Sequence, residues 1–185
     1  MDLIHTLYTR RSIRKYKMTP VPKEVITKLL EAATLAPSAS NSQPWSFVVL
    51  QDTQLLKTYS DRAKELCLAS IKDKPDPHNY RKILADPDFN IFYNAGTLII
   101  IYGHEGATTF EDCSLAAQNL MLAAHAEGLG TCWIGFSIAL LDNQDFKKEL
   151  GIPQDSTAVA PIIVGYPELV PSSYTRNPPR ILLWK

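Results

Sequence analysis

The segment Glu111–Glu127, with the sequence EDCSLAAQNLMLAAHAE, decides how the rest of the chain is arranged. On a helix of this sequence Leu115, Leu120 and Met121 fall on one side, and alanines fill most of the opposite side. An α-helix that is apolar on nearly every side is buried in a core or in an interface. Because Gly128 ends the pattern, the sequence predicts one long central helix around which the other elements pack.

Four β-strands are predicted around this helix. Thr97–Tyr102 (TLIIIY) precedes it and Thr131–Ile134 (TCWI) follows it, while Trp45–Leu50 (WSFVVL) lies nearer the N-terminus. Thr97–Tyr102 and Trp45–Leu50 carry apolar residues on both faces, so we expect both to be central strands. The fourth strand, Thr157–Val164, contains Pro161 and is therefore expected at an edge or a bulge.

The remaining patterns predict shorter helices and one irregular segment. Apolar residues spaced by three or four positions predict helices at Leu3–Tyr8, Glu24–Ala36, Gln54–Ile71 and Asp145–Leu150. Lys72–Asn90 contains three prolines and is predicted to be irregular and mobile. Helices outweigh strands and the two do not alternate regularly, which indicates an α+β domain.

The composition limits the number of domains and the kinds of partner. With 185 residues, 45% hydrophobic and 21% charged, the chain is expected to form a single domain over residues 1–185. Nineteen basic and nineteen acidic residues give no net charge, which argues against a nucleic-acid partner. No apolar run reaches the roughly 18 residues of a membrane span, and Asp2 stands where a signal peptide is basic. We therefore expect a cytoplasmic protein with no membrane partner.

The three cysteines, Cys67, Cys113 and Cys132, lie far apart, without a CxxC motif or a nearby histidine at ligand spacing. This spacing supports neither a disulfide framework nor a metal site. We expect reduced thiols in the core.

The N-terminal region carries a local excess of positive charge. Six cations and no acid lie between Asp2 and Glu24, and four of the cations crowd into Arg10–Lys15 (RRSIRK). Guanidinium groups bind phosphate oxygens in pairs, and Ser12 adds a hydroxyl. The segment suits a phosphate dianion or the electron-rich edge of a ring. A solvated basic turn has the same composition, so both interpretations stand at this point.

Two loops and two side chains are ambiguous in the same way. The loop within Ala36–Trp45 (APSASNSQPW) can hydrogen-bond the rim of a planar ligand, although its residues are also ordinary turn formers. Gly128–Gly135 has the spacing G-x-G-x4-G and follows a helix, so it does not match the dinucleotide fingerprint, which follows a strand. We interpret His125 as a hydrogen-bonded core residue and Asp112 as an acid in the first turn of the central helix.

Taken in order, several motifs resemble those of the nitroreductase family of FMN-dependent oxidoreductases. They are Arg10-Arg11-Ser12-x-Arg14-x-Tyr16, Pro37-Ser38-Ala39-Ser40-Asn41-Ser42-Gln43-Pro44-Trp45, Gly128-Leu129-Gly130 with Cys132-Trp133-Ile134-Gly135, Val164-Gly165-Tyr166-Pro167, and Arg176. The resemblance extends from the first helix to about Arg180. It implies a mostly antiparallel central sheet flanked by helices, with the long buried helix at the interface of a homodimer.

The resemblance implies that residues near both ends of the chain bind FMN. Arg10, Arg11 and Ser12 would contact the phosphate, the ribityl chain and a ring carbonyl. Arg14 would place positive charge near N1 and O2, where the reduced flavin is anionic. Arg176 matches the second phosphate-binding cation of the family, with Arg180 as a further candidate.

The resemblance also implies two flavin sites that the subunits share. Pro37, Ser38, Ala39, Ser40, Asn41 and Gln43 would reach the flavin of the other subunit. Cys132, Trp133, Ile134 and Gly135 would lie along the flavin, with main-chain N–H groups facing N5. The C-terminal Ile181–Trp184 looks like the arm by which such chains embrace a partner.

The implied activity is a ping-pong reduction, in which NAD(P)H gives hydride to flavin N5 and a nitroaromatic, quinone or related small molecule then accepts the electrons. The flavin carries the difficult step, so no side chain is expected to be catalytic. The alternatives are reductive dehalogenation or flavin breakdown on the same fold, and a non-enzymatic flavin-binding module. The chain departs from larger members in having no acid at Ile134 or Gly135, no clear match for flavin-contacting residues within Lys72–Asn90, and no insertions that roof the pocket.

Overall fold

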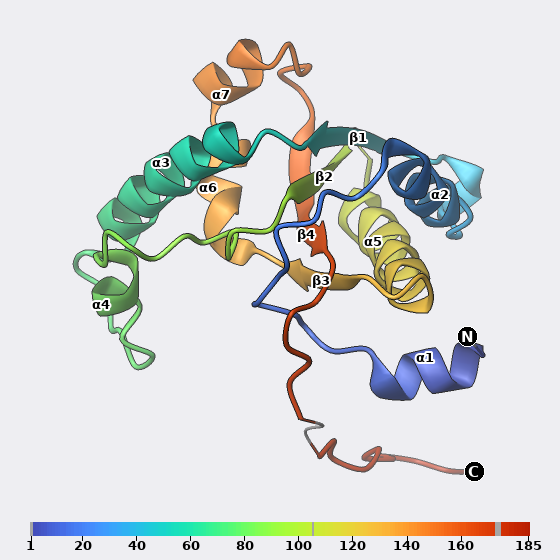
Figure 1. Cartoon of the computed structure of the whole chain (residues 1–185). Coiled ribbons are helices and arrows are strands. Elements are labelled where there is room, and N and C mark those ends of the chain that lie inside the picture. The colour runs from blue at the N-terminus through green and yellow to red at the C-terminus, as the bar shows by residue number, and fades with distance from the viewer. Residues whose placement is uncertain (1, 105, 173–174) are drawn as a thin grey trace.

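The structure is a computed structural model that describes residues 2–104, 106–172 and 175–185 (Figure 1). A four-stranded antiparallel sheet has the order β1-β2-β4-β3. Its strands are β1 (Trp45–Leu50), β2 (Thr97–Gly103), β3 (Gly130–Trp133) and β4 (Thr157–Gly165). The helices are α1 (Leu3–Thr9), α2 (Lys23–Thr34), α3 (Thr53–Ile71), α4 (Tyr80–Leu84), α5 (Thr109–Ala126), α6 (Ile138–Leu141) and α7 (Gln144–Glu149), with short 3-10 turns η1 (Ala39–Asn41) and η2 (Gly135–Ser137). The α+β class is confirmed.

The sheet separates two hydrophobic cores, which gives the domain three layers (Figure 1). On one face, α2 and α5 pack with Ile99 and Ile101 of β2. On the other face, α3, α6 and α7 pack with Leu98, Ile100 and Tyr102 of the same strand. Successive side chains of a strand point to opposite faces, so the uninterrupted apolar run of β2 supplies both cores. The prediction that this strand is central is confirmed.

The long helix predicted from the sequence is α5, and it is buried on the side that faces the sheet. Cys113, Ala116 and Leu120 are fully buried against strands and α2. The small alanines allow this close packing. On the other side Phe110 and Leu115 keep 59% and 45% of their surface exposed within one chain. The apolar helix therefore keeps two large apolar side chains exposed within one chain.

The prediction that Trp45–Leu50 is central is wrong, because β1 lies at the edge of the sheet and pairs only with β2. From Phe47 to Leu50 the strand is half-buried. Phe47 packs against the core on one face and Val48 against the core on the other. The apolar pattern indicates that both faces of the strand are covered. It does not indicate whether the strand has hydrogen-bonded neighbours along both of its edges.

Pro161 lies within β4, a central strand, at a position where no neighbouring strand lacks a hydrogen bond because the proline has no N–H. The ladder with β2 contains a bulge nearby, between Ile101 and Tyr102. The Pro161 carbonyl accepts a hydrogen bond from the N–H of Ile134, at 2.8 Å, just past the end of β3. Because the amide nitrogen and the carbonyl of one strand residue face the same side, the proline nitrogen also points past the end of β3. Neither alternative, edge or bulge, describes Pro161 itself, because β4 is central and the bulge lies two residues away, opposite Ile101 and Tyr102.

Lys72–Asn90, predicted to be irregular, contains α4 and a hydrogen-bonded turn. Asp76 accepts hydrogen bonds from the main-chain N–H groups of Tyr80 and Arg81, at 2.7 and 2.8 Å. The prediction is wrong for Tyr80–Leu84, which form α4, whereas the rest of the segment consists of turns and irregular chain as predicted. The prediction failed because a five-residue helix is too short to show an apolar period.

Candidate functional site

The basic N-terminal segment is held against the sheet by main-chain hydrogen bonds. Ser12 forms a parallel bridge with Thr131 of β3, and the N–H of Ile13 donates to the Thr131 carbonyl at 2.9 Å. Farther along, the N–H of Lys17 donates to the Tyr166 carbonyl, also at 2.9 Å. The segment is thus an ordered extension of the sheet, and its side chains have defined positions.

Two glycines allow this close approach. A β-carbon added to Gly130 would come 2.5 Å from Cγ1 of Ile13, and one added to Gly165 would come 2.8 Å from the Tyr16 ring. Both are far below an ordinary van der Waals contact. The glycines in the two motifs therefore have a positional role, which is to let the basic segment lie directly on β3 and β4.

The cations near both ends of the chain meet in one cavity of about 230 Å³. It is lined by Arg10, Arg11, Ser12, Arg14, Pro171 and Arg176. Burial, followed by the charges of Arg176 and Arg11, lowers the pKa of Arg10. Within the described residues none of these arginines forms a salt bridge with an acid. Guanidinium groups that repel one another and have no carboxylate partner form a site that a phosphate dianion would neutralise.

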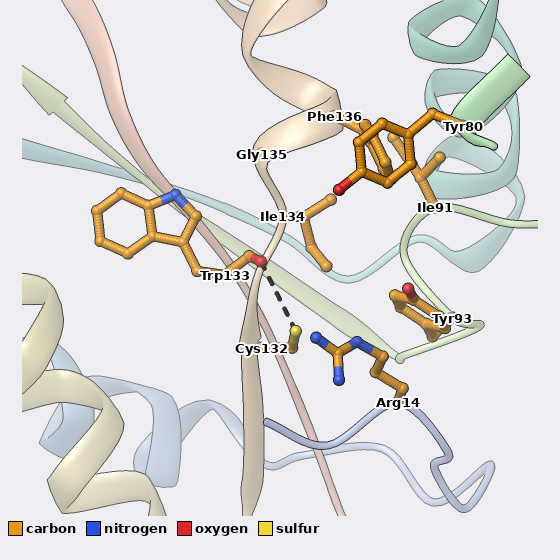
Figure 2. Close-up of a pocket in the computed structure, with 9 residues that line it drawn as sticks. All are labelled: Arg14, Tyr80, Ile91, Tyr93, Cys132, Trp133, Ile134, Gly135 and Phe136. Atoms are coloured by element: carbon orange, nitrogen blue, oxygen red, sulfur yellow. Dashed lines mark hydrogen bonds between the residues drawn. The ribbon is translucent and has the colours of Figure 1, made fainter. Parts of the chain in front are cut away.

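A second cavity, of about 270 Å³, adjoins the first through Arg14, which lines both (Figure 2). Its other lining residues are mostly aromatic or aliphatic: Tyr80, Ile91, Tyr93, Cys132, Trp133, Ile134, Gly135 and Phe136. The pair of cavities thus joins a cationic compartment to an apolar one. This arrangement fits a phosphorylated ligand with a planar ring system, and FMN is such a molecule.

Cys132–Gly135, predicted to lie along the cofactor, lines the apolar cavity as a continuous stretch. Figure 2 shows the Trp133 indole directed away from the other labelled side chains, so this residue contributes main chain. Burial raises the pKa of the Cys132 thiol, and Arg14 acts in the opposite direction. The described cysteines form no disulfide, and Cys113 and Cys132 are buried as expected, whereas Cys67 is half-buried.

Four residues of the apolar cavity were not singled out from the sequence: Tyr80, Ile91, Tyr93 and Phe136. Tyr93 lies with its ring 5.9 Å from the guanidinium carbon of Arg14. Its φ of 52° is uncommon for an aromatic residue. Such backbone strain is found disproportionately at functional sites. The sequence signal was an aromatic pair, Phe92–Tyr93, directly before the central strand.

The serine-rich loop does not line either cavity within one chain. Pro37, Ser38, Ala39, Ser40, Asn41 and Gln43 are absent from the lining of both. The buried carboxylate of Asp112 accepts hydrogen bonds from the Ala39 N–H, the Ser42 hydroxyl and the Thr108 hydroxyl, at 3.1, 3.5 and 3.0 Å. Ser40, Asn41 and Gln43 have positive φ. The first-turn position of Asp112 is confirmed, and the residue also anchors a strained loop.

Two further residues discussed from the sequence, His125 and Arg180, line neither cavity. His125 Nε2 lies 2.8 Å from the Thr9 hydroxyl and joins α5 to α1, so the predicted hydrogen bond is present. The prediction that His125 is a core residue is wrong, because the side chain is half-buried and belongs to neither hydrophobic core. No cluster of three or more His, Cys, Asp or Glu side chains in the described ranges is placed to hold a metal ion.

The lining of the paired cavities fits a phosphorylated ligand with a planar ring. A family model described as "Nitroreductase family" matches residues 7–166. A protein of Methanothermobacter thermautotrophicus named "Putative NADH dehydrogenase/NAD(P)H nitroreductase" is 32% identical, across 100% of this chain and 88% of its own. The 5,6-dimethylbenzimidazole synthase of Rhodospirillum rubrum is 29% identical, across 85% and 78%. The chain belongs to the nitroreductase family.

Solved structures agree with this assignment. A nitroreductase with bound FMN from Bacteroides fragilis superimposes with a TM-score of 0.86 over the whole of both chains, at 24% identity. An FMN-dependent nitroreductase from Clostridium difficile has a TM-score of 0.68 and 29% identity over 93% of this chain and 91% of its own. Among the described helices, none is long and apolar enough to cross a bilayer.

Proposed function

We propose that this chain is an FMN-dependent oxidoreductase that uses NAD(P)H to reduce quinone, nitroaromatic or related acceptors. The observation that carries the proposal is the meeting of Arg10 and Arg176, from opposite ends of the chain, beside an apolar cavity. Family membership and a 29% identical FMN-dependent nitroreductase support FMN as the ligand. For a quinone, the overall reaction converts NAD(P)H, one proton and the quinone to NAD(P)+ and the hydroquinone.

The residues of this chain would bind and tune the cofactor. Arg10, Arg11 and Arg176, with the Ser12 hydroxyl, would hold the phosphate in the cationic cavity. Arg14, at the junction of the two cavities, would stabilise negative charge on the pyrimidine edge of the ring system. When bound, FMN supplies the chemistry, because it takes up two electrons as hydride and releases them to an acceptor. With no acid at Ile134 or Gly135, main-chain groups of this stretch would contact the ring.

We further propose a homodimer with shared sites. Phe110 and Leu115 of α5 are exposed, and so are Leu182 and Trp184, each at 84%. These apolar side chains lie on α5 and on a C-terminal segment that runs away from the sheet (Figure 1). Covering them with a second copy removes apolar surface from water. In such a dimer the loop Pro37–Gln43, anchored by Asp112, would contact the flavin bound by the other subunit. Sedimentation analysis should then find twice the chain mass, and deletion of residues 181–185 should weaken the dimer.

The experiment that tests the activity is anaerobic reduction of the purified protein. The protein should carry FMN and show the visible absorption band of oxidised flavin. Addition of NADH or NADPH should bleach the band, and a quinone or nitroaromatic should restore it. A flavin that stays oxidised with both nucleotides would contradict the proposal.

One relative favours a second candidate, because a dimethylbenzimidazole synthase is 29% identical. In that case the chain would belong to the branch that breaks down flavin, and aerobic incubation of the reduced protein would consume the flavin itself. Release of iodide or bromide from a halogenated phenol would indicate the dehalogenating branch. Stable FMN binding without turnover of any acceptor would identify a flavin-binding module.

A further inference from the structure

Arg14 lines three hollows, and its long side chain is exposed within one chain. Two of them are the cationic and the apolar cavity, and the third hollow has a volume of about 400 Å³. Asp88 and Glu168 line the third hollow, and Lys15 pairs with Glu168 at 3.1 Å. An arginine side chain has many rotamers, and carboxylates attract its guanidinium. The position of the Arg14 guanidinium therefore depends on the side chains that lie beside it.

The ring of Tyr93 lies beside this guanidinium, with 5.9 Å between the ring centroid and the guanidinium carbon of Arg14 (Figure 2). Tyr93 lines both the apolar cavity and the third hollow, as Arg14 does. A guanidinium at this distance from the face of an aromatic ring is attracted to it. Burial raises the pKa of Tyr93, and the charge of Arg14 acts in the opposite direction. At neutral pH the contact is therefore between a cation and an uncharged ring.

The backbone of Tyr93 has a conformation that tyrosine rarely adopts. Tyr93 and Asn94 have φ angles of 52° and 54°, both in the left-handed region. The Tyr93 N–H donates to the Asn90 carbonyl at 2.8 Å, and the Asn90 side-chain amide donates to Asn94 Oδ1 at 3.0 Å. Asn90 Oδ1 in turn accepts from the Phe92 N–H at 2.8 Å. These hydrogen bonds stabilise a turn that the tyrosine itself disfavours.

Helix α3 anchors this turn from behind. The ammonium group of Lys64, a buried residue of α3, donates to the Phe89 carbonyl at 2.8 Å. The Ser60 hydroxyl of the same helix accepts from the Ile91 N–H at 3.0 Å. The Phe89 and Tyr93 rings pack edge to face, with centroids 5.7 Å apart. The place of the Tyr93 ring is thus fixed by contacts with α3 and by the turn, independently of any ligand.

A guanidinium beside the flavin ring acts on one redox state more than on the other. Oxidised FMN has an uncharged ring system, and uptake of a hydride, which is two electrons and one proton, gives that ring system a negative charge. A cation at the pyrimidine edge stabilises the charged form and raises the midpoint potential. In the proposed site Arg10 and Arg176 hold the phosphate. A displacement of Arg14 alone should therefore lower the potential and leave the affinity for oxidised FMN nearly unchanged.

We infer that Tyr93 is a positioning residue, whose ring keeps the Arg14 guanidinium at the pyrimidine edge of bound FMN and so raises the midpoint potential of the flavin. The inference rests on the FMN site of the proposed function and adds to it a residue and a redox property. Tyr93 acts through Arg14, and its hydroxyl has no part in the effect. This role explains why a tyrosine occupies the turn, since glycine and asparagine, which favour such a backbone, have no aromatic ring.

The test measures the midpoint potential of the FMN-loaded protein during stepwise reduction by dithionite, so that it does not depend on NAD(P)H. Tyr93→Asn removes the ring and suits the left-handed backbone, so the fold is retained. It should lower the ratio of the Kd for oxidised FMN to the Kd for reduced FMN about fivefold, a fall in potential of about 20 mV for a two-electron couple. The Kd for oxidised FMN, from fluorescence titration, should change less than about twofold.

Two further variants control for the hydroxyl group and for the surroundings. Tyr93→Phe keeps the ring and should have the wild-type potential. Met18→Ala removes an exposed apolar side chain from the third hollow, outside both cavities, and should also have the wild-type potential.

A double-mutant cycle shows whether Tyr93 acts through Arg14. Arg14→Ala alone should lower the potential at least as much as Tyr93→Asn does, and addition of Tyr93→Asn to Arg14→Ala should cause no further fall. Four results would overturn the inference: an unchanged potential in Tyr93→Asn, the same fall in Tyr93→Phe, the same fall in Met18→Ala, or a further fall when Tyr93→Asn is added to Arg14→Ala.

Lys64→Met keeps the test available if Tyr93→Asn does not fold, because it releases the turn from α3 and leaves the Tyr93 ring in the chain. It should lower the potential in the wild-type background and leave it unchanged in the Arg14→Ala background, and the opposite pattern would contradict the inference.

The potential also separates this inference from the proposed function. A fall in Tyr93→Asn that depends on Arg14 supports the inference even if neither NADH nor NADPH reduces the protein. Equal potentials in wild type and Tyr93→Asn contradict it even if NAD(P)H reduction succeeds.

Discussion

Gly130 lies directly beneath the side chain of Ile13, so close that a β-carbon at Gly130 would come 2.5 Å from Ile13 Cγ1. This contact joins the start of β3 to the segment that carries Arg10 and Arg14. The main-chain hydrogen bond from Ile13 to Thr131 depends on the same close approach. The basic segment, and with it the cationic cavity, can occupy this position because Gly130 has no side chain.

Gly130→Ala should displace Ile13 and, with it, the neighbouring arginines. Overpacking of this kind costs about 1–3 kcal/mol of unfolding free energy. The amount of FMN bound per folded chain should also fall, because the arginines are displaced. Gly96→Ala is the matched control, since a β-carbon there meets nothing within 4 Å. The measurements are FMN per chain after purification and urea unfolding. Wild-type FMN content in Gly130→Ala would show that the packing does not position the site.

Replacing Arg10 and Arg176 together by alanine should weaken FMN binding by about 3 kcal/mol or more, because two charge-assisted contacts are lost. The unfolding free energy of the FMN-free protein should not fall, since the charge of Arg176 disfavours the charged form of Arg10. Lys17→Ala removes a nearby charge outside both cavities and serves as the control. Fluorescence titration with FMN measures the affinity. Unchanged FMN affinity in the double variant would show that the cluster is a solvated basic turn and not the phosphate site.

Asp112→Ala should release the serine-rich loop. The Ala39 N–H and the hydroxyls of Ser42 and Thr108 lose a charged acceptor, and a hydrogen bond to a charged group contributes about 1.5–3 kcal/mol to the unfolding free energy. If the loop serves the partner's flavin, FMN affinity should fall as well. Glu111→Ala, at the exposed neighbouring position, should change neither quantity. A loss of stability without a change in FMN affinity would limit the role of Asp112 to the fold.

The stability of the protein should fall as pH decreases through the range in which His125 titrates. Burial, followed by the charges of Arg10, His5 and Arg11, lowers the pKa of His125. The unfolded chain therefore binds this proton at a higher pH than the folded protein does. The contribution to stability is complete above the unfolded pKa of about 6.5 and is lost as pH falls below it, toward the folded pKa. Urea unfolding from about pH 8 to pH 5 measures the slope, which should be shallower in His125→Gln.

Local patterns in the sequence predicted most elements of the fold. The periodicity of Gln54–Ile71 and of Glu111–Glu127 corresponds to α3 and α5 within a few residues. The predicted helix Asp145–Leu150 corresponds to α7, and Gly151 follows it with a φ of 68°, the left-handed conformation that glycine commonly adopts after a helix. These features depend on contacts within one or two helical turns, which the order of residues expresses directly.

The sequence predicted only part of the candidate site. Arg10–Arg14 and Cys132–Gly135 form motifs and were found, and both line the paired cavities. Tyr80 was not found, because a single tyrosine in a proline-rich segment resembles any exposed loop residue. Tyr93 was not found, because the pair Phe92–Tyr93 before a buried strand resembles part of the core. Their place in the site appears only in the fold, which brings Tyr93 beside Arg14 and Tyr80 beside Phe136.

The sequence by itself determined the α+β class, the long central helix and the charge that gathers in Arg10–Lys15, because propensity, periodicity and local charge are properties of neighbouring residues. The tertiary structure alone decided that β1 lies at an edge and that Tyr80 and Tyr93 line the cavity beside Arg14. It also brought Arg176, which the sequence connected with Arg10 only through the family resemblance, into one cavity with Arg10, and the loop Pro37–Gln43 does not line that cavity. Each of these depends on contacts between residues far apart in the chain. Such contacts form when the whole fold buries its apolar surface and pairs its main-chain hydrogen-bonding groups, and both depend on all layers of the domain together.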